Sequence, residues 1–75
     1  MTRLATLGNA ETKTFRIEAD ETVVWLVSGG ATVSLDGDVI STLAEGDPQV
    51  LDGLPAGHEI LVTATSATTV VKVSP

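Results

Sequence analysis

The stretch Thr22–Leu43, TVVWLVSGGATVSLDGDVISTL, holds two turn signals between three runs of β-forming residues. Asp36 and Gly37 suit a two-residue type I′ loop, because both central residues of that turn need a positive φ. We therefore predict a β-hairpin between Ala31–Leu35 and Asp38–Leu43.

The alternation of apolar and polar residues continues through the chain, and turn residues recur at roughly every 8–12 positions, as in all-β domains. We expect an all-β fold, a small antiparallel β-sandwich or jelly-roll-like barrel of about six to seven short strands. Besides the hairpin, strands are expected over Lys13–Ala19, Thr22–Ser28, Gln49–Leu51, Glu59–Thr65 and Thr69–Val73. The last two should pair as a final hairpin across Ser66-Ala67-Thr68.

The strand over Thr22–Ser28 is apolar on both of its faces, which is typical of a strand covered on both sides. If Val23, Trp25 and Val27 fill the core, the opposite face, with Val24 and Leu26, needs a cover of its own. A second sheet within the chain would supply that cover, and so would a neighbouring subunit in a symmetric oligomer. On the first strand, we expect Phe15, Ile17 and Ala19 to face the core.

We expect residues 1–12 to form an amino-terminal arm and residues 13–75 to form a single β domain. Leu4 and Leu7 are apolar although the arm lies outside the expected strands, which indicates docking on another surface. The alternative is a frayed terminus, because chain ends are usually mobile.

Composition narrows the classes of function. A 75-residue chain buries only about 60% of its unfolded surface, and the absence of cysteine removes disulfides and thiolate metal sites, so association is the expected stabiliser. The net charge of -6 disfavours direct contact with nucleic acid. We expect no membrane span, because no segment approaches about 20 apolar residues, and the amino end has no apolar signal core.

No residue pattern points to catalysis, since the sequence holds no nucleophile elbow and no phosphate-binding loop. Asp36 and Asp38 flank a hairpin tip, where solvent keeps both ionised. His58, the single histidine, could join Asp47 or Asp52 at a metal, but zinc sites usually take three or four protein ligands. We therefore predict a non-enzymatic protein without cofactor or metal, in which His58 is structural or lies at a subunit contact.

One resemblance covers about half of the chain. The run WLVSGGATVSLDGDVISTLAEGDPQVLDGLPAGHEI, residues 25–60, resembles the middle of a cupin, with a Leu-Ala-Glu-Gly-Asp turn at residues 43–47 and Pro-Ala-Gly at residues 55–57 before His58. Cupins bind a metal through an early His-x-His pair, a glutamate and a later histidine, and here only the later histidine has a counterpart. The resemblance implies a jelly-roll-like shape and, as an alternative function, a minimal cupin-like module that binds a small ligand or metal.

The whole chain resembles the small structural β proteins of tailed-bacteriophage virions, among them the capsid decoration, or cement, proteins. The likeness lies in the Thr/Val/Ala/Gly-rich, cysteine-free phrases TFRIEADETVVWLVSGGATVSL, residues 14–35, and LPAGHEILVTATSATTVVKV, residues 54–73. It implies a virion protein on the capsid surface, made in the host cytoplasm, that binds the major capsid protein and copies of itself, with a trimer favoured. The expected oligomer or capsid interface comprises Leu4, Leu7, Val24, Leu26 and His58. A β scaffold with no ligand is a third possibility.

Overall fold

A computed structural model describes residues 2–75, and within them every regular element is a β-strand. The eight strands are β1 (Arg3–Leu7), β2 (Thr12–Arg16), β3 (Glu21–Ser28), β4 (Ala31–Leu35), β5 (Asp38–Leu43), β6 (Gln49–Asp52), β7 (Glu59–Ala64) and β8 (Thr69–Ser74). The predicted all-β class is confirmed, with eight strands in place of six to seven. In this part of the chain there is no helix that could cross a membrane.

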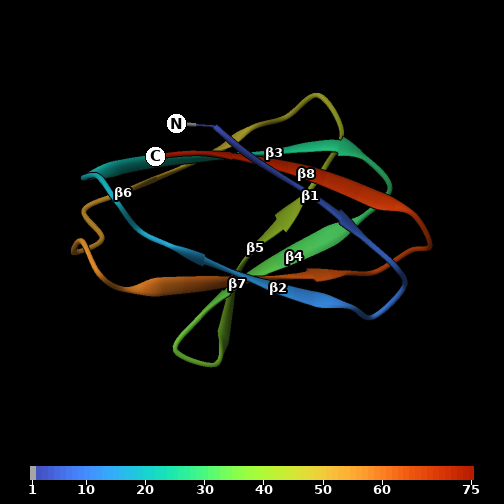
Figure 1. Cartoon of the computed structure of the whole chain (residues 1–75), viewed down its shortest axis with the longest axis horizontal. Helices are drawn as coiled ribbons and strands as arrows, with labels where there is room; N and C mark the ends of the chain where they lie inside the picture. The colour runs from blue at the N-terminus through green and yellow to red at the C-terminus, as the bar shows by residue number, and fades with distance from the viewer. Residues whose placement is uncertain (1) are drawn as a thin grey trace.

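The strands form two four-stranded antiparallel sheets, which Figure 1 shows as two layers. Sheet A has the order β1-β8-β3-β6, and sheet B has the order β2-β7-β4-β5. Every connection between successive strands crosses from one sheet to the other, except the one between β4 and β5. This order is that of a jelly roll, in which two Greek keys wind around one core. The predicted β-sandwich is therefore present, in its jelly-roll form.

The core is the single layer of side chains between the two sheets. It is built by strict alternation, as in β8, where inward residues are fully shielded and outward ones are half-buried. The buried hydrophobic residues are Leu7, Phe15, Ile17, Val24, Leu26, Ala31, Val33, Leu43, Ile60, Val62, Ala64, Val71 and Val73. The prediction that Phe15 and Ile17 face the core is confirmed, while Ala19 is only half-buried.

The hairpin of β4 and β5 is confirmed with its predicted turn. Leu35 pairs with Asp38, and the two residues between them have positive φ, 52° at Asp36 and 86° at Gly37. These values are those of the type I′ loop that the Asp-Gly pair predicts.

The predicted final hairpin is wrong, because β7 and β8 lie in opposite sheets. The chain over residues 65–68 crosses the sandwich and is tied to the β3–β4 crossing: Thr65 N donates to Gly30 O at 2.8 Å, and the Thr69 hydroxyl bonds Gly30 O at 3.0 Å. A short polar link that joins two strands of one sheet has the same kind of sequence as one that crosses between two sheets. Here the crossing lets both strands bury their inward residues on the shared core.

The predicted arm is also wrong, because Arg3–Leu7 is a regular strand. It pairs with β8 from Arg3 opposite Val73 to Leu7 opposite Thr69, so residues 2–12 belong to the same sandwich as the rest. Leu7 is buried in the core of its own chain, which explains its apolar character without a partner. Met1, which also fell in the predicted arm, lies outside the described residues.

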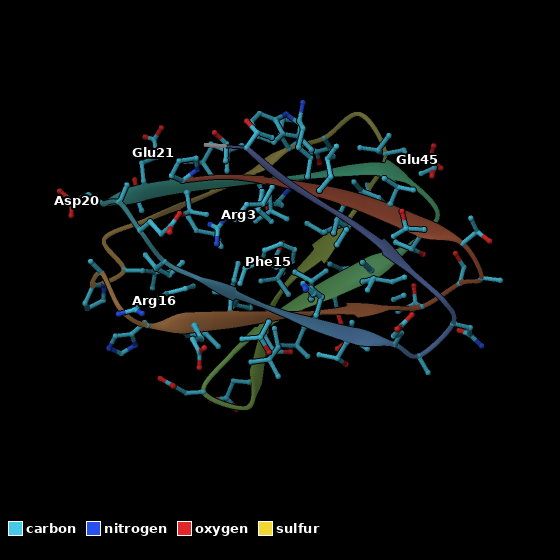
Figure 2. All side chains as sticks on the ribbon, in the orientation of Figure 1. Arg3, Phe15, Arg16, Asp20, Glu21 and Glu45 are labelled. Atoms are coloured by element: carbon cyan, nitrogen blue, oxygen red, sulfur yellow. The ribbon has the colours of Figure 1, made fainter. Side chains whose placement is uncertain are left out.

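Arg3 connects the two sheets at the start of β1, beside the last residue of β2 and at the opposite end from the β1–β2 link. Its guanidinium lies 5.5 Å from the Phe15 ring centroid, and its Nη1 donates to the Arg16 carbonyl at 2.9 Å. Glu18 lies 3.9 Å from Nη2. Figure 2 shows Arg3 and Phe15 between the two layers. An arginine guanidinium that lies over an aromatic ring covers core surface that the short edge strands leave open.

Two buried threonines of sheet A differ in how their hydroxyls are satisfied, and this difference predicts opposite mutant effects. Among residues 2–75 the Thr22 hydroxyl has no hydrogen-bond partner, whereas the Thr69 hydroxyl can donate to the carbonyl of Gly30 or of Ser66, each at 3.0 Å. We expect Thr22→Val to raise the free energy of unfolding by about 1 kcal/mol, because it removes an unpaired buried hydroxyl. Thr69→Val should lower it by about 1–2 kcal/mol. Chemical denaturation measures both, and equal effects of the two substitutions would contradict the assignment.

Candidate functional site

The residues predicted for an interface are divided between the core and the surface. Leu7, Val24 and Leu26 are buried between the sheets, whereas Leu4 and His58 are exposed. The structure does not bring these five residues together into one site.

The two faces of β3 are the reverse of those considered from the sequence. Val24 and Leu26 face the core, and the cover that they needed is sheet B of the same chain. Val23, Trp25 and Val27 point outward, so the arrangement in which they would fill the core is not the one that forms. The reason lies in the strand's neighbour, because the outward partner of Trp25 is Lys72, whose charged end needs water.

Trp25 lies at the centre of an apolar surface on the outer side of sheet A, which we call the Trp25 face. The Lys72 ammonium lies 4.5 Å from the Trp25 ring centroid, close enough for an attraction of about 0.5–1 kcal/mol at an exposed site. Leu4 is 68% exposed and Val50 is 56% exposed. The face comprises Leu4, Val23, Trp25, Val27, Val50, Val70 and Lys72.

The Trp25 face ends in an acidic pair. Glu21 and Asp52 are partners across β3 and β6, and both are exposed. Figure 2 shows Glu21 at one end of the layer that holds β3. Like charges directly opposite each other on a sheet are unfavourable unless a cation lies near them. The described strands of sheet A place the positive charge of Lys72 and this acidic pair on one face, separated by the row of Val23 and Val50.

A second apolar surface lies on sheet B, and we call it the Leu61 patch. It comprises Val39, Ile40 and Leu61, all of them exposed. Leu61 and Val39 are the two partners of Ser34 on either side, so they lie in one row across the sheet. Ile40 occupies the bulge of β5 beside them, where the register shifts. The sequence signal was the pair Val39-Ile40, since a strict alternation leaves no room for two successive apolar residues.

His58 lies beside this patch rather than inside the sandwich. A shallow hollow of about 380 Å³ is lined by Asp36, Gly37, Gly57, His58, Glu59 and Leu61. The space between the sheets is filled by residues such as Val33, Ile60 and Val62, all fully buried. Among residues 2–75, no group of three or more His, Asp or Glu side chains is placed to hold a metal ion.

Comparison of the chain with protein-family models, with curated proteins and with solved structures gave no match. The chain is a small two-sheet β-sandwich with an apolar surface on each layer. Function is therefore inferred from these surfaces.

The assignment of the two faces of sheet A is testable with one pair of substitutions. Val24→Asp should leave no folded protein, because it puts a charge into a core that has no partner for it. Val50→Asp, on the outward side of β6, should change the free energy of unfolding by less than about 1 kcal/mol. Circular dichroism and urea denaturation measure both. A folded Val24→Asp variant of near wild-type stability would refute the assignment.

Proposed function

We propose that this chain is a non-enzymatic structural protein that links protein surfaces, and that it acts as a capsid decoration, or cement, protein of a phage virion. The observation that carries the proposal is the placement of its exposed large hydrophobic residues. Among residues 2–75, Leu4, Val27 and Val50 lie on sheet A, and Val39, Ile40 and Leu61 lie on sheet B. A domain with one apolar surface on each layer can bind two neighbours at once.

The chemistry of the two surfaces supports protein partners. Exposed apolar patches on small soluble domains usually mark interaction sites, and aromatic residues such as Trp25 are enriched at the centres of interfaces. The net charge of -6 keeps free copies apart and soluble, so association depends on the apolar surfaces. The partners that we propose are the major capsid protein and copies of the chain itself, on the outer surface of a capsid assembled in the host cytoplasm.

The proposal is tested by binding to purified capsid shells of the phage whose genome encodes this sequence. We expect the protein to cosediment with the shells and to raise their melting temperature. Leu61→Asp should weaken binding by about tenfold or more, because it places a charge in the apolar contact. Ala67→Asp is the matched control, with the same added charge in an exposed turn, and should bind as the wild type does. Shells that neither retain nor respond to the wild-type protein would refute the proposal.

The hollow at His58 supports a second candidate, a module that binds a small polar ligand. His58, Asp36 and Glu59 offer both hydrogen-bond donors and acceptors around a space of about 380 Å³. A thermal-shift screen with sugars, nucleotides and divalent ions tests it. A shift that the wild type shows and His58→Ala loses would favour this candidate, and the absence of any shift in the wild type would remove it.

A further inference from the structure

We propose that the Trp25 face binds a second copy of this chain across a twofold axis, so that the protein forms a face-to-face dimer. This inference rests on the proposed function, because it names the partner of one of the two surfaces on which that function depends. The occupant follows from the positions of the charges on the face.

The outward residues of β3 and its neighbours form three successive rows across the sheet. The middle row contains Val23 and its partner Val50. One step along the strand in one direction is the row of Trp25 with Lys72, and one step in the other direction is the pair of Glu21 and Asp52. Each step covers two residues, about 6.6 Å, so the cation and the acidic pair are equally far from the middle row.

This spacing makes the face complementary to itself. A twofold axis in the plane of the contact, running along the Val23 and Val50 row, would lay each copy's Trp25 row over the other copy's acidic row. Lys72 leans over the ring of Trp25, on β3, and its ammonium would therefore meet Glu21 of the second copy, which also lies on β3. Two such ion pairs would form per dimer, and the like-charge opposition of Glu21 and Asp52 would be relieved.

The alternative twofold axis would run along the Trp25 row. It would cover more apolar surface, since Val23 would face Val27 of the other copy. However, it would place two Lys72 ammonium groups against each other. Juxtaposed like charges at an interface are strongly unfavourable. The electrostatic term therefore selects the axis along Val23 and Val50, and a self-complementary face of this kind closes as a dimer rather than a trimer.

The free edges of the described sheets favour contact through faces over contact through strand pairing. In the alternation along their strands, Arg3 on β1 and Lys13 on β2 occupy inward-facing positions. Inward-pointing charges on an edge strand discourage pairing with another chain. The β5 edge carries a bulge, and β6 has only four residues. Each edge thus has a feature that blocks regular extension of the sheet.

The dimer would place the two Leu61 patches on its outer sides, because each lies on the sheet remote from the contact. One dimer could then contact two protein surfaces at once, one through each Leu61 patch.

Sedimentation velocity of the full chain over a range from micromolar to millimolar concentration tests the proposal. We expect a concentration-dependent dimer and a shift of Trp25 fluorescence to shorter wavelength as it forms. Lys72→Glu and Glu21→Lys should each weaken the dimer by about tenfold or more, and the double exchange should restore it. Lys13→Glu, on the edge of sheet B, makes the same charge change as Lys72→Glu and should leave the dimer intact.

Three results would overturn the inference: a wild-type chain that stays monomeric, a trimer, or a double exchange that remains as weak as the single variants while circular dichroism shows it folded. The outcome is separable from that of the proposed function. A monomer that still binds shells leaves the proposed function standing, and a dimer that ignores shells leaves the dimer standing without it.

Discussion

The single layer of side chains between the two sheets is the constraint on which the rest of the structure depends. Val24, Val71 and Val73 from sheet A and Val33, Ile60 and Val62 from sheet B are wholly shielded within it, and Phe15 is its one aromatic residue. A layer this thin has few inward positions, whereas 43% of the chain is hydrophobic. The excess apolar residues therefore lie on the outer faces of the two sheets.

The connectivity adds a second constraint, because crossing strands must pass each other closely at the ends of the sandwich. A Cβ atom on Gly29 would lie 2.5 Å from the Thr69 hydroxyl oxygen and 2.8 Å from the Thr69 Cα, and the φ of Gly29 is +91°. Only glycine fits both the space and the backbone angle. The β3–β4 link therefore packs closely against the start of β8, and this contact helps to fix how sheet A lies on sheet B.

Sequence reasoning reached the parts of the fold that local chemistry determines. The Asp36-Gly37 turn, the strands around it and the all-β class follow from backbone preference and period-two patterning. Two predictions were wrong because tertiary contacts decide the structure there. The turn before Thr69 was expected to stay within one sheet, and β1 was expected to be an arm. The inward face of β3 could not be predicted for the same reason, because Val23, Trp25 and Val27 are as apolar as Val24 and Leu26. The two faces are distinguished by the charged residues on the outward one, Lys72 beside Trp25 and Glu21 opposite Asp52.

The four basic residues lie in two kinds of place, the edges of the sheets and the Trp25 face. Arg3 and Lys13 lie on the edge strands β1 and β2, where a charge discourages pairing, and Arg16 is the last residue of β2, with its guanidinium near Gly57. Lys72 alone lies in the middle of an apolar face. Because ten carboxylates cover much of the remaining surface, two chains repel each other in most orientations. In the dimer that we propose, the orientation that brings Lys72 to an acidic pair is favoured, so charge placement, more than apolar area, sets the geometry of the contact.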